Sequence, residues 1–516
     1  MSVHPESIKT LGELKKSGWK PRTVKDEMRS NLMRMLRNGD PMFSGILGYE
    51  KTVIPQLQNA ILARHDIILL GLRGQAKTRI LRSLIQFLDE YIPVIEGSEI
   101  SDDPFGPLSR FGKDTLTAKG DDTPLQWLHR SQRYAEKLAT PDTTVADLIG
   151  DIDPIKAATR KMALSDEKVI NYGVIPRTNR GIFAINELPD LQPRIQVSLL
   201  NIMQERDIQI RGFNVRIPLD IMMVFSANPE DYTNRGNIIT PLKDRIDSQI
   251  ITHYPKSIEV GIAITEQEAW THRESDVEIG IPDFMKQIIQ QISFEARESE
   301  YIDEKSGVSA RLTITAMEQM VSAAERRAIM NGDKKTVVRI SDLYHGVPAL
   351  TGKMELVYEG EQEGAVNVAK HLIGKAISAI FRKHFPDPFL GDNRKNPVYS
   401  DILQWFARGY KVEISDALND KAYATVLAAV EGLEKLAELH GKKAERVYRY
   451  AEMDFILEAL HQKSMLGKED VEDERSYSDM IGSMLGNLGS ADAGGDDDDD
   501  GFDDGRSGSG RGRRRR

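Results

Sequence analysis

The sequence predicts an α/β fold in which a parallel sheet is flanked by helices and followed by a mainly helical region. The first observation is an apolar run at residues 66–71 that leads into a helical pattern, with apolar side chains on one face at Ile80, Leu81, Leu84, Ile85 and Leu88. The second is that residues 181–185 and 221–227 are also short, continuously apolar runs. Such runs are typical of strands buried on both faces. A buried strand, a glycine turn and a helix open a parallel sheet.

The remaining elements are predicted from their periodicity. Apolar residues recur at helical spacing over 53–61 and again over 195–204. Residues 208–217 alternate apolar and polar side chains on both sides of Gly212, and this pattern predicts a β-hairpin. Helical patterns dominate residues 256–388 and 400–464.

These patterns divide the chain into five predicted parts. A polar helical extension at 1–45 precedes the α/β core at 46–255, a helical domain with an insert at 256–388, and further helices at 389–468. Residues 469–516 are rich in Gly, Ser and Asp, with an acidic block at 496–500 and an arginine-rich end. A segment of this composition cannot bury enough apolar surface to fold alone, so it is expected to be a disordered tail.

Composition excludes several classes of function. The 516 residues carry a net charge of −10, which speaks against general nucleic-acid binding because that needs a basic face. With no cysteine, the chain has no disulfide, thiolate metal site or cysteine nucleophile. Its first residues are polar, and no run reaches the roughly 18 apolar residues of a membrane span. We expect a cytoplasmic protein without a membrane partner.

A phosphate-binding turn follows the first predicted strand. Residues 71–78 read Gly-Leu-Arg-Gly-Gln-Ala-Lys-Thr and open the helix whose apolar face runs from Ile80 to Leu88. The candidate binding residues of this turn are Gly71, Gly74, Gln75, Ala76, Lys77 and Thr78. Glycines let successive backbone N–H groups point inward, and the helix N-terminus adds partial positive charge.

Two side chains complete the nucleotide chemistry of the turn. Lys77 is expected to contact the β- and γ-phosphates of ATP, and Thr78 to offer its hydroxyl to Mg²⁺. Ala76 stands where glycine usually precedes the lysine. Alanine is the smallest alternative, and the turn is expected to tolerate it if its φ is negative.

The strand at 181–185 ends in Asn186 and Glu187. Glu187 is placed to orient or deprotonate a water that attacks the γ-phosphate. Asn186 stands where an aspartate usually supports Mg²⁺. Its amide oxygen can still accept from a metal-bound water, but it carries no charge, so we expect slower hydrolysis or weaker Mg²⁺ binding.

Two further residues follow in the order that hydrolysis needs. Asn228 ends the apolar run at 221–227, where its amide can sense both the γ-phosphate and the water. Arg245 follows Asp244 shortly afterwards. In a ring of subunits such an arginine reaches the neighbour's γ-phosphate and stabilises charge in the transition state.

Taken together, these segments resemble the AAA+ ATPases of the magnesium-chelatase and MoxR group. The resemblance covers residues 46–252 and rests on segments that occur in order: 46–50, 103–107, 148–157, 178–188, the 208–217 hairpin and the Asp244-Arg245 pair. Asn186 departs from the pattern. Residues 309–312 are similar to the opening of a lid helix in which Arg311 would contact the nucleotide of its own or a neighbouring subunit.

The resemblance implies an AAA+ core with a helical lid that binds ATP and Mg²⁺ in a homo-oligomeric, hexameric ring. It also implies a partner protein with a von Willebrand/integrin-type metal-binding domain, which this chain lacks. Three hypotheses remain open: a motor that activates or remodels a partner, a motor subunit of a tetrapyrrole metal chelatase, and a nucleotide-gated scaffold with weak turnover because of Asn186. The segment at 353–364 has no explanation from the sequence alone.

Overall fold

The structure is a computed structural model, which describes residues 7–480 apart from 154, 156–157, 160–166, 206, 210–215, 229–236, 392–393, 441–445 and 472–473. The chain forms two compact units. The first comprises Met1–Ser275, Asp283–Ala323 and Asp342–Ala376, and the second Asp276–Pro282, Ala324–Ser341 and the chain from Ile377 onward. The first unit joins the predicted α/β core to residues 256–275, 283–323 and 342–376 of the predicted helical domain, so it does not follow the predicted boundaries at 255/256 and 388/389.

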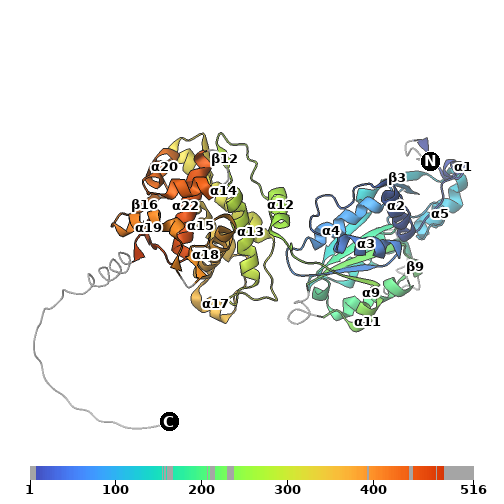
Figure 1. The fold of residues 1–516 in the computed structure, drawn as a ribbon. Helices are drawn as coiled ribbons and strands as arrows, with labels where there is room; N and C mark the ends of the chain where they lie inside the picture. Colours follow the sequence, from blue (N-terminus) through green and yellow to red (C-terminus); the bar gives the residue numbers. More distant parts are fainter. Residues whose placement is uncertain are drawn as a thin grey trace, which may run out of the picture. The chain divides into compact units, whose positions relative to one another are not determined.

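A five-stranded sheet lies at the centre of the first unit (Figure 1). Its order is β11-β1-β10-β7-β4, and every neighbouring pair is parallel. The strands are β1 (Ile67–Leu70), β4 (Tyr134–Leu138), β7 (Gly181–Asn186), β10 (Ile221–Ala227) and β11 (Ser248–Ile251). The three predicted strands are therefore confirmed. The strand order reverses beside β1, and in open α/β sheets ligands bind at such a point, outside the carboxyl ends of the strands.

Alternate residues of these strands face two separate cores. Ile67 and Leu69 pack with one group of helices, whereas Ile68 points to the other face. The first face is covered by α2 (Val24–Asn38), α3 (Val53–Leu62) and α4 (Lys77–Ser83), and the opposite one by α6 (Val145–Leu148), α8 (Val174–Arg177), α9 (Pro193–Glu205) and α11 (Thr240–Arg245) (Figure 1). Strands covered on both faces explain the continuous apolar runs in the sequence.

Among the described residues of the first unit, three antiparallel strand pairs lie outside the main sheet. They join β2 (Tyr91–Ile95) to β3 (Leu125–His129), β5 (Gly150–Ile152) to β6 (Ile170–Tyr172), and β8 (Asp207–Gln209) to β9 (Arg216–Pro218). The last pair confirms the predicted hairpin, with Ile208 opposite Ile217. Its turn, including Gly212, lies outside the described residues.

The N-terminal extension is part of the core. Its helix α1 (Leu11–Lys16) begins with a capping box at Thr10 and packs against Leu125. Its second helix, α2, buries Val24, Met28 and Leu32 in the core beneath the sheet. The helices agree with the prediction for residues 1–45. The sequence of this extension shows no long apolar stripe, because polar contacts provide much of the attachment of its helices to the core.

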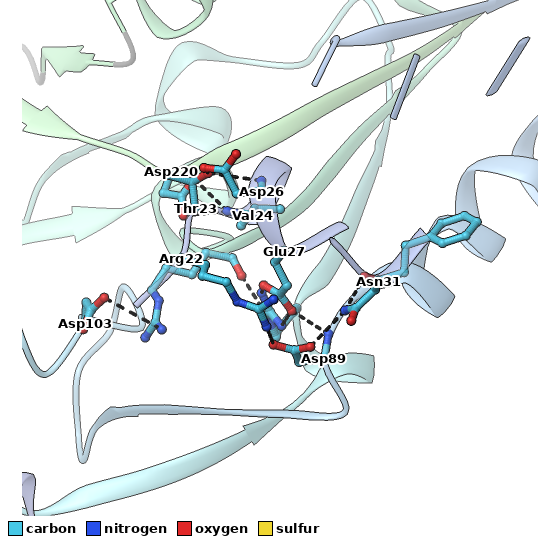
Figure 2. Close-up of polar contacts among 12 residues, drawn as sticks. Arg22, Thr23, Val24, Asp26, Glu27, Asn31, Asp89, Asp103 and Asp220 are labelled. Atoms are coloured by element: carbon cyan, nitrogen blue, oxygen red, sulfur yellow. Dashed lines mark hydrogen bonds and ion pairs between the residues drawn. The ribbon is translucent and has the colours of Figure 1, made fainter. Parts of the chain in front are cut away.

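A buried ion pair fixes α2 to the core (Figure 2). Glu27 accepts two hydrogen bonds of 2.7 Å from Arg133, and the two side chains are only 4% and 1% exposed. Arg133 also donates to the carbonyl of Arg180 just before β7. Removing one partner of such a pair costs about 3–5 kcal/mol, because the remaining charge stays buried. The extension therefore holds the strand that ends in Glu187.

Helices dominate the chain after β11, as predicted (Figure 1). They are α12 (Ile258–Glu268), α13 (Asp283–Arg297), α14 (Arg311–Asn331), α15 (Ile340–Tyr344), α16 (Val347–Thr351), α17 (Tyr358–Glu363), α18 (Ala365–His384), α19 (Ser400–Ala407), α20 (Asp420–Ala428), α21 (Leu433–His440) and α22 (Arg446–Gln462). Two short strand pairs accompany them, β12 (Glu278–Gly280) with β13 (Lys335–Val337) and β14 (Phe389–Leu390) with β15 (Arg394–Lys395). Within the described ranges, no helix has the length and apolar character needed to cross a membrane.

The prediction of a disordered tail from residue 469 is wrong for its first residues. β17 (Gly467–Val471) and β18 (Glu474–Ser478) form a three-stranded antiparallel sheet with β16 (Val412–Ser415) in the second unit. These residues show no apolar alternation, because several of their inward-facing side chains are charged. The rest of the predicted tail, residues 481–516, lies outside the described residues.

Charged side chains attach this sheet to α22. Asp454 and Glu458 are fully buried one helical turn apart, and Arg475 of β18 donates to Asp454. Glu458 accepts a 2.6 Å hydrogen bond from the hydroxyl of Tyr477 and pairs with Lys468 at 3.2 Å. Burial opposes ionisation of Glu458, but Lys468 and Arg475 outweigh it and lower its pKa to about 2.

Ending the chain after Leu466 should destabilise the second unit, whereas ending it after Met480 should not. The shorter chain loses β17 and β18, so Asp454 and Glu458 stay buried without their cationic partners, at a cost of about 3–5 kcal/mol for each broken pair. Thermal unfolding followed by circular dichroism measures the difference. Arg408→Ala in the longer chain is the control, because it removes an exposed ion pair with Glu431. Equal melting temperatures for the two truncated chains would contradict the proposed attachment.

Candidate nucleotide site

The predicted phosphate-binding turn joins the end of β1 to the start of α4. A Cβ atom on Gly71 would lie 2.0 Å from the Thr252 Oγ1 and 2.2 Å from the Gln75 Oε1. Gly74 has a φ of +73°, and a Cβ there would lie 2.1 Å from the Ser309 Oγ. Both glycines are therefore required by close packing of the turn, and this packing holds the backbone in a narrow curve.

Buried hydrogen bonds fix the turn to the end of β11. Thr252 donates to the side-chain oxygen of Gln75 at 2.6 Å. The hydroxyl of Tyr49 donates to the carbonyls of Gln75 and His253 at 3.0 and 2.7 Å. Burial raises the pKa of Tyr49 to about 12, so this phenol remains a donor at neutral pH. Thr252 was not identified from the sequence, because nothing in its local pattern separates it from an ordinary strand-end residue.

Lys77 is the first residue of α4 and is only 7% exposed. Its ammonium group turns back into the curve and donates to the carbonyls of Gly71 and Leu72, the latter at 3.0 Å. The charge is thus held inside the loop that the glycines shape. Thr78 follows it in the helix, and both residues line a cavity that opens along the turn.

The condition placed on Ala76 is not met. We expected the turn to tolerate alanine at a negative φ. Instead, the φ of Ala76 is +57° and its ψ is 17°, which is the left-handed conformation. A left-handed conformation costs about 1–2 kcal/mol for a residue with a Cβ. The surrounding contacts of the turn therefore hold Ala76 in a strained position, as is common at functional sites.

The predicted hydrolysis residues lie at the carboxyl edge of β7 and β10. The pairing of Ile185 with Phe225 places Asn186 beside Ser226, whose hydroxyl donates to the Asn186 Oδ1 at 3.1 Å. Glu187 follows with a left-handed φ of +55°. Asn228 is 3% exposed, and among the described atoms its Oδ1 has no hydrogen-bond partner. A buried amide oxygen in that state is suited to accept from a ligand or water.

A cavity of about 960 Å³ opens along the turn. Of the predicted site residues, it is lined by Gly74, Gln75, Ala76, Lys77, Thr78, Glu187 and Arg311. Residues 45–49 and 253–255 form another part of its wall. Gly71, Asn186 and Asn228 are not part of this wall. The structure thus brings the phosphate turn, Glu187 and Arg311 together in the first unit.

Arg245 lies elsewhere. It ends α11, where its guanidinium donates to the Gln204 Oε1 at 2.8 and 3.1 Å and to the carbonyl of Pro241 at 2.8 Å. It does not line the cavity of its own chain. This position agrees with a residue that does not serve its own site.

Comparisons with known proteins agree with this geometry. Residues 125–246 match the AAA domain of the dynein-related subfamily. The magnesium-chelatase 38 kDa subunits of Cereibacter sphaeroides and Rhodobacter capsulatus are 26% identical over 238 residues and 24% identical over 254 residues. These matches cover 44% and 46% of this chain and 64% and 66% of those proteins, so this chain spans less than two thirds of each relative.

The chain carries an AAA domain and is similar to magnesium-chelatase subunits. One chain of a magnesium-chelatase complex between subunits BchI and BchD is also similar to this protein, at 18% identity. The match covers 62% of this chain and 98% of that BchI–BchD chain, with a TM-score of 0.32. The match to the AAA domain begins at residue 125, so it does not include the phosphate turn at residues 71–78. The turn is therefore identified from its sequence and its geometry alone.

Gly71→Ala should weaken ATP binding by tenfold or more. The added methyl group would displace Thr252 and Gln75, whose hydrogen bond fixes the turn. The measurement is equilibrium binding of a fluorescent ATP analogue. Gly106→Ala is the matched control in the same unit, because nothing lies within 4 Å of its added Cβ. Unchanged affinity in Gly71→Ala would show that the turn does not bind phosphate.

Proposed function

We propose that this protein binds and hydrolyses Mg-ATP in a ring of identical subunits and uses the energy to remodel a partner protein. The observation that carries the proposal is the ammonium group of Lys77, held inside a glycine-shaped turn, with Glu187 in the wall of the same cavity. Side-chain oxygens of Thr252, Gln75 and Ser309 occupy the space that a Cβ on Gly71 or Gly74 would need, so glycine is required for the turn to curl. A turn curled in this way can present its backbone N–H groups to a phosphate.

The residues divide the chemistry among them. Lys77 and the backbone of the turn bind the β- and γ-phosphates, and Arg311 contacts the nucleotide of its own chain, because it lines the same cavity. Thr78 and the Asn186 oxygen would hold Mg²⁺ or its water, and the ion supplies charge neutralisation at the phosphates when bound. Glu187 orients the attacking water and accepts its proton, while Asn228 fixes the position of that water.

A ring is proposed because Arg245 lies outside the cavity of its own chain. Hydrogen bonds to Gln204 and Pro241 hold it at the end of α11, so it can present a guanidinium to a neighbouring subunit. An arginine supplied in this way contributes about 10³-fold or more to phosphoryl transfer in related enzymes. The resemblance to magnesium-chelatase subunits supports a hexamer.

The nature of the partner rests on the same resemblance. A von Willebrand/integrin-type metal-binding domain on a separate protein is the proposed partner of the ring. The two chelatase relatives also support a more specific alternative, in which this chain is the motor subunit of a tetrapyrrole metal chelatase.

One contact favours a second function from another class. The Asn186 side chain carries no charge, and its oxygen already accepts from Ser226. A site with weaker hold on Mg²⁺ would bind ATP and assemble but turn it over slowly, as a nucleotide-gated scaffold does. The turnover number of the unaltered protein separates the motor from the scaffold.

Glu187→Gln should bind ATP as tightly as the unaltered protein and lose at least about 100-fold in turnover, because the carboxylate acts in the hydrolytic step and not in ground-state binding. Phosphate release under saturating ATP measures the turnover. Glu278→Gln is the control, because that glutamate forms an exposed ion pair with Lys335 and neither residue lines the cavity. Turnover at the parent rate in Glu187→Gln would show that another group is the base.

A further inference from the structure

The segment at 353–364, which the sequence left unexplained, belongs to the nucleotide site. Gly352, Lys353, Met354 and Glu355 line the cavity in the first unit. We call residues 352–364 the strap. Residues 352–355 of the strap form part of the cavity wall. Most of the remaining strap residues form α17.

The strap is joined to a second segment, residues 301–310, by backbone contacts. Leu356 forms an antiparallel bridge with Ile302, and the carbonyl of Glu355 accepts from the Asp303 N–H at 2.9 Å. The Val357 N–H donates to the carbonyl of Tyr301 at 3.1 Å. These bonds make the strap and the 301–310 loop one layer, so that movement of either moves the other.

The 301–310 loop lies directly against the phosphate turn. A Cβ on Gly307, which has a φ of +64°, would lie 2.7 Å from the Leu72 Cδ1. At the second glycine of the turn, the Ser309 Oγ is the atom that a Cβ on Gly74 would meet. Such close approach at two points leaves no room for another chain between the loop and the turn.

One ion pair connects the strap itself to the turn. Arg73, which lies between Leu72 and the second glycine, donates to the Glu355 Oε1 at 2.5 Å. The hydroxyl of Ser306 donates to the other carboxylate oxygen, which fixes the orientation of Glu355. Both charged side chains are 51% exposed, so the pair can open and close without burying an unpaired charge.

We propose that Glu355 is a positioning residue that latches the strap to the phosphate turn and thereby slows nucleotide exchange. The proposal rests on the proposed nucleotide-binding function. A nucleotide in the cavity has the strap as one wall, and the ion pair with Arg73 must break before that wall can move away from the phosphates. The ligand held in this way is a nucleoside di- or triphosphate.

The test is the dissociation rate of a fluorescent ADP analogue from the full chain, after a chase with excess unlabelled ATP. Glu355→Gln keeps the size of the side chain and loses its charge, and it should release the analogue about two- to fivefold faster, which is the range of an exposed ion pair. Arg73→Ala should have a similar effect, and the double variant should be no faster than either single one.

Two features distinguish a latch from a general structural role. The ratio between the variant and parent release rates should fall towards one as salt is raised, because salt screens the exposed pair. The melting temperature of Glu355→Gln should equal that of the parent. Glu431→Gln is the matched control, because it breaks an equally exposed ion pair with Arg408 in the second unit and should leave release unchanged.

The outcomes are separable. If the parent protein binds the analogue and Glu355→Gln releases it at the parent rate, the latch is overturned while the proposed function stands. If the parent protein shows no saturable binding, the proposed function fails first. Exchanging the two charges, with Arg73→Glu and Glu355→Arg in one chain, should return release towards the parent rate, and a double variant that stays fast would contradict an ionic latch.

Discussion

The site depends on the parallel pairing of β1 with β10 and β11. Because these strands run in the same direction and are in register, their last residues end at one edge: Leu70 lies between Ala227 and Ile251. The next residue of each strand is therefore Gly71, Asn228 or Thr252. Three segments that are up to 181 residues apart in sequence, as Gly71 and Thr252 are, meet there without any long side chain having to reach across. The turn, the sensing amide and the hydroxyl that fixes the turn all follow from this pairing.

Buried polar contacts fix the start of β7, at the opposite end of that strand from Asn186. The buried pair between Glu27 and Arg133 attaches α2 to this start, and the carbonyl of Arg180 shares the same guanidinium. Burial lowers the pKa of Arg180, whose guanidinium donates to the carbonyl of Pro93 and whose charge faces Asp103. Buried charges of this kind specify one arrangement of the strands more than they add to stability. The strained conformation of Ala76 is tolerated in this fixed surrounding.

The sequence was informative where local chemistry decides the structure. The apolar runs at β1, β7 and β10, the turn around Lys77 and the paired strands near 208–217 were predicted because each depends on neighbours in the sequence. What could not be predicted depends on distant residues. Thr252 and Ser309 pack on the turn from far along the chain, and Glu355 reaches it from a segment with no recognisable pattern. The β17–β18 pair was missed because two of its inward side chains, Arg475 and Lys468, are charged and pair with Asp454 and Glu458 of α22. The sign of φ at Ala76 is likewise set by tertiary contacts and not by the residue type.

Subunit mixing tests the central claim, an ATP-hydrolysing ring whose sites are completed by neighbouring chains. Lys77→Ala removes the ammonium group from the phosphate turn, and Arg245→Ala removes the guanidinium offered to a neighbour, so each protein alone should be nearly inactive. When the two are mixed, some interfaces would join an intact turn to an intact arginine. The account predicts that the mixture regains part of the parent ATPase activity, with a maximum near equal amounts. If each variant is inactive alone and no mixture regains activity, the site is completed within one chain, and the ring mechanism is wrong.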